Sequence, residues 1–144
     1  MIKFDTSEID KFVIDLKGAS EDIRSGVQKV LKKSGFNIEA RAKRNITNNG
    51  SVKTGHLRRG ITTNIGNMEV TVHTSNIKYA RGVEEGTRPH TIRAKNKKAL
   101  YWKGAKHPVK SVRHPGSKAK PYLIPAFEKE KEVLIKDLKK VIEW

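Results

Sequence analysis

Apolar residues recur at helical spacing in two stretches of the first fifty residues. The first stretch, over 9–16, predicts a short amphipathic helix that ends before Gly18. The second begins after Ser20, a candidate N-cap, and predicts a longer helix that the turn-rich run 45–51 ends. The stripe residues are Ile9, Phe12, Val13 and Leu16 in the first stretch, and Ile23, Val27, Val30, Leu31, Ser34, Ile38, Ala42 and Ile46 in the second.

A third helical stripe follows Pro121 and predicts a helix over the last twenty residues. Pro125 suits the first turn, where its missing N–H is not needed. Glutamates at 128, 130 and 132 interleave with lysines at 129, 131 and 136, and Glu132 with Lys136 is an i,i+4 pair in the favourable order. The stripe consists of Phe127, Leu134, Leu138, Val141 and Ile142.

The period changes to two after Leu57. Runs 61–65 and 70–73 alternate β-branched with polar residues, and the Gly66-Asn67 turn between them predicts a β-hairpin. A second strand pair is predicted from 91–94 and 99–102, joined by the basic turn 95–98. The segment 79–86 between the hairpins is compatible with a short helix or an irregular crossing.

These elements predict an α+β fold in a single domain over residues 1–144. N-terminal helices and a C-terminal helix would pack on a small antiparallel sheet of two hairpins. All five prolines lie between positions 89 and 125, and the segment 103–120 has dense positive charge and little apolar content. We expect a basic, mobile loop at about 103–120.

Composition narrows the class of protein. The chain has 144 residues and no cysteine, which excludes disulfide scaffolds, cysteine zinc sites and cysteine nucleophiles. The longest apolar run is Ala99–Trp102, so no membrane span is expected, and the charged start of the chain does not have the pattern of a secretory signal.

The formal net charge of +16 lies in one part of the chain. Residues 1–50 sum to +3 and residues 121–144 sum to zero. Residues 51–120 contain sixteen Lys and Arg residues against Glu69, Glu84 and Glu85, a net of +13. Such a concentration of charge is typical of proteins that contact nucleic acid or acidic partner surfaces.

Residue types that could carry catalysis do not form a known catalytic pattern. His90, His107 and His114 are seventeen and seven residues apart and have no carboxylates nearby, so surface histidines are favoured over a metal site. Glu84 and Glu85 are adjacent and cannot converge on one bond. A salt bridge is expected for Glu84, within the subunit or between subunits, with Arg58, Arg59 or Arg81.

A nucleic-acid surface is the alternative that charge alone supports. Tyr101 and Trp102 could stack on bases, although neighbours on a strand face opposite sides. No sequence-reading motif accompanies them. The candidate basic surface consists of Lys95, Lys97, Lys98, Lys103, Lys106, Lys110, Arg113, Lys118 and Lys120.

Three phrases of the chain together resemble a known family. They are TGHLRRGI at 54–61, YARGVEEGT at 79–87, and HPG at 114–116 followed by PYLIPAF at 121–127. In this order they resemble the HK97 gp10-like family of tail-completion or head–tail joining proteins of tailed bacteriophages. Departures are mild: Gly60 stands where serine is common, and Val52-Lys53 replaces the usual proline.

The resemblance implies a structural virion protein of a tailed phage or prophage, without catalysis or cofactor. Such a protein is made in the host cytoplasm and located at the neck or tail end. Its partners would be other copies in an oligomeric ring, head-connector and tail proteins, and phage DNA through non-specific contact, with no membrane. The alternative function is a small basic non-specific nucleic-acid-binding protein.

The resemblance also selects candidate assembly residues within the three phrases and beside them. Glycines among them would supply backbone geometry that a side chain forbids, and threonines would form turns or contacts. The candidates are Thr54, Gly55, Leu57, Arg58, Tyr79, Glu84, Gly86, Thr87, His90, His114, Pro115, Gly116, Pro121 and Pro125.

Overall fold

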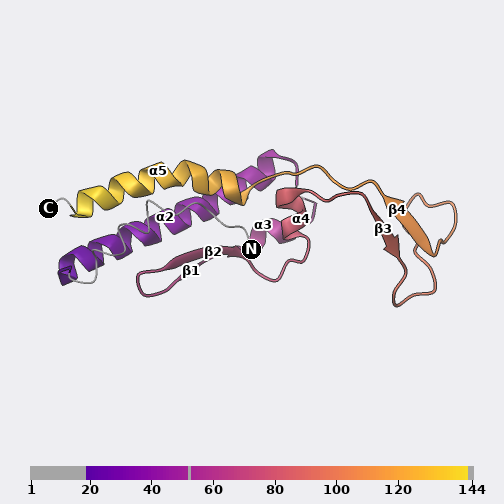
Figure 1. The fold of residues 1–144 in the computed structure, drawn as a ribbon, viewed down its shortest axis with the longest axis horizontal. Helices are drawn as coiled ribbons and strands as arrows, with labels where there is room; N and C mark the ends of the chain where they lie inside the picture. The colour runs from indigo at the N-terminus through magenta and orange to yellow at the C-terminus, as the bar shows by residue number, and fades with distance from the viewer. Residues whose placement is uncertain (1–18, 52, 143–144) are drawn as a thin grey trace.

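The structure, a computed structural model, describes residues 19–51 and 53–142. The expected helix over 9–16 lies outside these residues. Figure 1 shows two long helices side by side, a β-hairpin along one of them, and a second hairpin that extends away from the rest. We call the described residues up to 87 and from 121 onward the body, and residues 88–120 the basic arm. The predicted α+β class, with helices and two small antiparallel hairpins, is confirmed.

Helix α2 (Glu21–Asn48) forms where the longer apolar stripe predicts it. The Ser20 side chain accepts a hydrogen bond from the backbone N–H of Ile23 at 3.5 Å, so Ser20 caps the helix as expected. At the other end the N–H of Asn49 donates to the carbonyl of Asn45 at 2.9 Å. The buried residues of the helix follow the predicted stripe.

Helix α5 (Leu123–Ile142) lies antiparallel along α2 (Figure 1). The Lys33 ammonium contacts the Asp137 carboxylate at 2.9 Å, and Asn45 donates to the carbonyl of Tyr122 at 2.9 Å, so the start of one helix meets the end of the other. A smaller core joins the helices near the end of α5 and consists of Val27, Leu134 and Leu138.

Glu130 departs from the pattern expected of a charged residue on α5, because it is 1 % exposed. Asn37 of α2 donates to its Oε1 at 2.8 Å, and the Arg41 guanidinium lies 3.4 Å from its Oε2. Its position four residues after buried Ala126 and four before buried Leu134 puts it on the inward face of the helix. The partners on α2 make that burial tolerable.

Strands β1 (Ile61–Ile65) and β2 (Val70–Thr74) form the first predicted hairpin and pair with Ile61 opposite Thr74. The hairpin packs along α2 on the side away from α5 (Figure 1). Gly35 permits this close approach, because a Cβ there would clash with side chains of Thr63 and Val70. The main core joins α2, β1 and α5 with the segments between them, and consists of Ile38, Ala42, Ile46, Leu57, Ile61, Ile77, Ala80, Tyr122 and Ala126.

The predicted partner of the third strand is wrong. Strand β3 (His90–Arg93) pairs with β4 (Ser111–His114), so the predicted strand over 99–102 is not the partner. Leu100 instead forms a single bridge with Val109, inside the long connection. In the observed register Ile92 faces Val112, a β-branched pair that a strand at 99–102 would not supply. The segment expected as loop therefore contains a strand.

Two short helices complete the body. Helix α3 (His56–Arg59) leads into β1, and α4 (Ala80–Glu85) follows β2. The sequence left helix or irregular crossing open for 79–86, and the structure has the helix. Both helices lie at the end of the body from which the basic arm extends (Figure 1).

Candidate assembly site

The carboxylate of Glu84, on α4, caps the N-terminus of α5. Glu84 is 3 % exposed, its Oε2 accepts hydrogen bonds from the N–H groups of Tyr122 and Leu123 at 2.9 and 3.0 Å, and its Oε1 accepts one from Ile124 at 2.9 Å. First-turn N–H groups have no partner within their helix and carry the positive end of its dipole, so a carboxylate satisfies both needs. The second family phrase is thereby fixed to the third.

This geometry overturns the salt bridge expected for Glu84. Arg81 donates instead to Glu85 at 2.8 Å, and the Arg58 guanidinium donates to Thr47 of α2 at 3.3 Å. Neighbouring residues on a helix point in different directions, so Glu84 faces inward to backbone N–H groups while Glu85 faces solvent. The role of Glu84 is structural, with backbone as its partner.

The two chain segments at the base of the basic arm, just after α4, are joined by an isolated antiparallel β-bridge between Thr87 and Ser117. Thr87 and Ser117 exchange both backbone hydrogen bonds, at 2.9 and 3.0 Å, and their hydroxyl groups lie 2.9 Å apart. Gly86 and Gly116 flank the bridge with φ of 75° and 86°, and a Cβ on either would clash with backbone of the facing segment. At these two positions the backbone conformation and the close approach of the facing segment both favour glycine.

Side chains of the first family phrase contact those of the second. Leu57 is buried in the main core, while the His56 ring nitrogen and the Tyr79 hydroxyl lie 3.5 Å apart. Thr54 accepts a hydrogen bond from the N–H of His56 at 3.4 Å, which closes the turn before α3. Burial raises the pKa of Tyr122, under this junction, to about 12.

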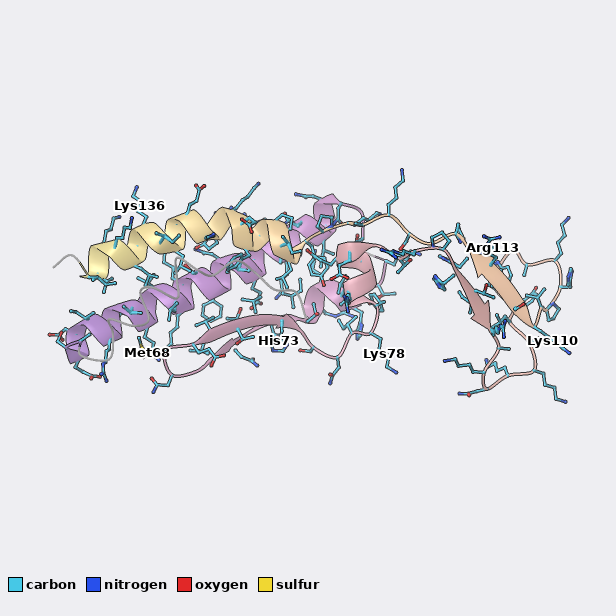
Figure 2. The ribbon with its side chains drawn as sticks, in the orientation of Figure 1. Met68, His73, Lys78, Lys110, Arg113 and Lys136 are labelled. Atoms are coloured by element: carbon cyan, nitrogen blue, oxygen red, sulfur yellow. The ribbon has the colours of Figure 1, made fainter. Side chains whose placement is uncertain are left out.

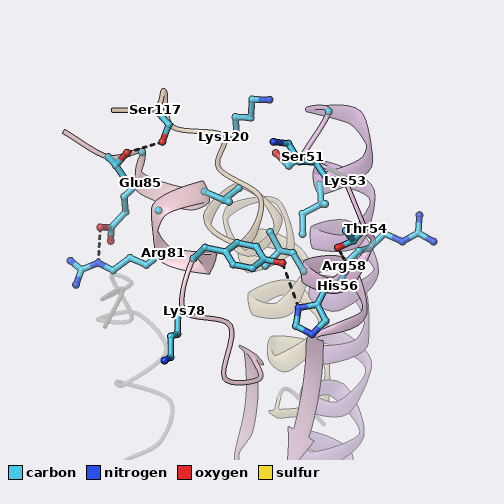
Figure 3. Close-up of a pocket in the computed structure, with 18 of the residues that line it drawn as sticks. Ser51, Lys53, Thr54, His56, Arg58, Lys78, Arg81, Glu85, Ser117 and Lys120 are labelled. Atoms are coloured by element: carbon cyan, nitrogen blue, oxygen red, sulfur yellow. Dashed lines mark hydrogen bonds and ion pairs between the residues drawn. The ribbon is translucent and has the colours of Figure 1, made fainter. Parts of the chain in front are cut away.

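The first two phrases, together with residues 117–120 between the halves of the third, line a groove of about 950 Å³ (Figure 3). Its apolar lining includes Ile46, Leu57 and Val83. Thr54, Gly55, Arg58, Tyr79, Gly86 and Thr87 of the predicted candidates also line it, and Ser117, Lys118 and Lys120 complete it from the third phrase's side. Segments more than sixty residues apart in the sequence thus form one concave surface.

The rim of the groove is cationic. Figure 3 shows Lys53, Lys78, Arg81 and Lys120 at its edges. Glu85 is the acidic residue among the lining residues, and its carboxylate is already paired with Arg81. The groove therefore combines apolar walls with uncompensated positive charge.

The basic arm has two different faces. Cross-strand pairs put Thr91 opposite Arg113 and Arg93 opposite Ser111 on one face. On the other face the rings of His90 and His114 stack at 5.1 Å, next to the Ile92–Val112 pair. The first face has hydroxyl and guanidinium groups alone, and all four of its side chains are exposed.

The predicted basic surface divides between two places. Lys118 and Lys120, at the base of the arm, line the groove, whereas Lys95, Lys97, Lys98, Lys103, Lys106, Lys110 and Arg113 lie farther along the arm. Figure 2 shows Lys110 and Arg113 on the arm, far from Lys136 on α5. Tyr101 and Trp102 are 69 % and 46 % exposed, so neither packs in a core.

Comparison with protein families gives one match. Residues 10–86 match the HK97-gp10_like family model, described as "Bacteriophage HK97-gp10, putative tail-component". The chain belongs to the HK97-gp10-like family. The match covers just over half of the chain, including α2, the first hairpin, the first phrase and the second phrase up to Gly86. Neither a curated protein nor a solved structure matches the chain.

Membership in the HK97-gp10-like family makes this chain a phage tail component. The resemblance seen in the sequence is confirmed, and its third phrase lies beyond the matched residues. Within 19–51 and 53–142 no helix is long and apolar enough to span a membrane. In the same residues no three metal-ligating side chains gather, and His107 does not join the His90–His114 stack.

The remaining candidates lie outside the groove. His90, His114 and Pro115 belong to the basic arm, and Pro121 and Pro125 flank the start of α5. Sequence reasoning did not select Lys53, Lys78 or Arg81, which line the groove. Each is within or next to a family phrase, and that position was the available signal.

Proposed function

We propose that this tail component completes the tail end or joins it to the head, and that it acts as one subunit of an oligomeric ring. The observation that carries the proposal is one preformed groove, lined by two separate family phrases and by residues 117–120, which connect the two halves of the third. Residues that serve folding alone would be expected in the core, yet Thr54, Tyr79 and Thr87 are exposed in the groove.

The chemistry of the groove suits a protein partner. Interfaces between proteins combine an apolar centre with a polar rim whose charges complement the partner. Val83 and the exposed ring of Tyr79 would form the centre, above the buried Ile46 and Leu57, and the rim lysines would favour a segment with carboxylates. In a ring each subunit uses two different surfaces, so the groove would hold a segment of the next copy or of a neighbouring phage protein.

The proposed mechanism is stepwise assembly through protein contacts, without a catalytic step. Glu84 and the Thr87–Ser117 bridge hold the groove's walls in place before a partner arrives. Preorganisation of this kind lowers the entropy cost of association.

Charge reversal in the groove tests this function. We expect Lys53→Glu with Lys78→Glu to lower the yield of joined, infectious particles by about tenfold or more, since like charges across an interface cost several kcal/mol. Electron microscopy of particles made in cells that express the variant would show filled heads and unattached tails. Native mass spectrometry of the purified protein reports loss of the ring.

The control has the same change of charge away from the groove. Lys136→Glu with Lys139→Glu alters exposed residues on α5, and we expect joined particles at the level of the unaltered protein. Normal joining by the groove variant would contradict the proposal, as would equal loss from both variants.

The alternative, a free-standing non-specific nucleic-acid-binding protein, has one observation in its favour: residues 88–120 contain no acidic residue. It predicts that disrupting the gene leaves particle joining intact. A joining protein predicts separate heads and tails from the same experiment.

A further inference from the structure

The basic arm has the composition of a surface that meets a polyanion. Its residues 88–120 include eleven Lys and Arg residues and not one Asp or Glu. None of these residues, all of which the structure describes, is buried. The arm therefore has no apolar core of its own, and nothing within it neutralises its charge.

The β3–β4 ribbon concentrates hydrogen-bond donors on one face. Arg93 and Arg113 lie diagonally across the two strands, each opposite a hydroxyl side chain, Ser111 or Thr91. Diagonal neighbours in an antiparallel pair have Cα atoms about 7 to 8 Å apart, within reach of one another's contacts. Guanidinium and hydroxyl groups are among the side chains that contact phosphate oxygens in complexes with DNA.

An acidic protein surface fits this face less well. A stable protein interface buries an apolar centre, and the apolar pair Ile92–Val112 lies on the opposite face of the ribbon. In a protein interface without an apolar centre, the cost of removing water from two arginines would offset most of the attraction to an acidic partner. Binding to a phosphate backbone instead releases condensed counterions, which favours a purely cationic surface.

We propose that the Thr91–Arg93–Ser111–Arg113 face of the basic arm binds the phosphodiester backbone of duplex DNA without reading its sequence. A two-stranded ribbon fits the major groove, about 12 Å wide, where both of its edges approach phosphates. The lysines of the connection 94–110 extend the contact beyond the strands (Figure 2). That this DNA is the phage genome rests on the proposed function. The binding of duplex DNA by this face is argued from the arm's residues alone.

Fluorescence anisotropy of the full chain with a labelled, mixed-sequence duplex of about 30 bp tests the proposal, over about 50 to 200 mM NaCl. We expect Arg93→Gln with Arg113→Gln to weaken binding by about tenfold and to lower the slope of log K against log [salt] by about 2. Lys32→Gln with Arg44→Gln removes the same charge from exposed sites on α2, and we expect about twofold weakening or less.

Three results would overturn the proposal. They are absence of duplex binding at low salt, equal losses from the two double variants, and competition by poly-L-glutamate as strong as that by unlabelled duplex at equal charge. The last result would point to an acidic protein surface as the partner. Circular dichroism melts of both variants check that the fold is intact. Particle joining is measured separately, so failure here leaves the proposed assembly role standing.

Discussion

The body and the basic arm differ in what holds them together. Every buried residue of the described chain lies in the body, where α2 packs against α5 on one side and the first hairpin on the other. The arm is one two-stranded ribbon with long connections and no buried side chain. A lone hairpin is marginally stable in water, so the arm's order depends on its attachment at Thr87–Ser117.

The distribution of charge follows the same division. The arm contributes +11 of the net +16, while acids of the body such as Glu39 and Asp137 have basic partners. Self-repulsion is tolerable in the arm because its side chains remain hydrated. The difference shows that stability and the surface for contact with partners are assigned to separate parts of one small chain.

The largest expected difference between the two regions is the cost of losing apolar side chains. Ile46 of α2 is 0 % exposed, whereas Ile92 of β3 is 38 % exposed. We expect Ile46→Ala to lower the free energy of unfolding by about 2 to 5 kcal/mol, because a cavity remains in the main core. Ile92→Ala should cost less than about 1 kcal/mol in urea denaturation. Similar costs for the two would show that the arm shares a core with the body.

The next effect tests the part of the body beside the base of the arm, through two adjacent residues. We expect Glu84→Gln to lower the free energy of unfolding by about 1 to 3 kcal/mol, since an amide has one oxygen for three N–H groups of α5 and adds donors in a buried place. Glu85→Gln removes an exposed ion pair and should cost less than about 0.5 kcal/mol. Thermal or urea unfolding measures both, and equal costs would contradict the capping role of Glu84.

The smallest expected effect is the loss of stability of the body at acid pH, through Glu39. Burial opposes ionisation of Glu39, but hydrogen bonds from Lys43 and Thr63 outweigh it and lower the pKa of Glu39 below its ordinary value. A lowered folded pKa gives stability that is present above the unfolded value, about 4.3, and is lost as pH falls through the folded one. We expect Glu39→Gln to reduce this acid loss by less than about 1 kcal/mol. Urea denaturation between about pH 5 and pH 3 measures it, and a larger acid loss in the variant would contradict the prediction.

For the arm we expect no corresponding effect of acid. It has no carboxylate, so chemical shifts of β3 and β4 amides should not titrate over that pH range while the native fold persists. Titration of those amides would show that an acid of the body contacts the arm.

The elements with strong periodicity could be predicted from the sequence. The α2 stripe, the α5 stripe and the Gly66-Asn67 hairpin each bury one face against a partner, and that burial leaves a pattern in the chain. The second hairpin buries neither face, so its strands leave little pattern. The apolar run 99–102 therefore gives the stronger strand signal, although β3 pairs with 111–114 in the structure.

The candidate site could be predicted in its parts and not in its arrangement. The family phrases supplied Gly55, Tyr79 and Thr87, yet nothing in the sequence indicates that loops sixty residues apart form one groove. The role of Glu84 was missed for a related reason: its partners are backbone N–H groups, which every sequence contains. Glu130 was open to prediction, since its spacing from Ala126 and Leu134 places it inward.

Amide hydrogen exchange of the full chain, with and without the duplex of about 30 bp, tests the division of roles most directly. We predict that α2, α5 and the first hairpin exchange slowly in both samples, at rates set by global unfolding. Amides of β3 and β4 should exchange through local opening in the free protein and become protected with DNA. Protection that appears on α2 or α5 instead, or arm amides as slow as those of the body without DNA, would contradict the account.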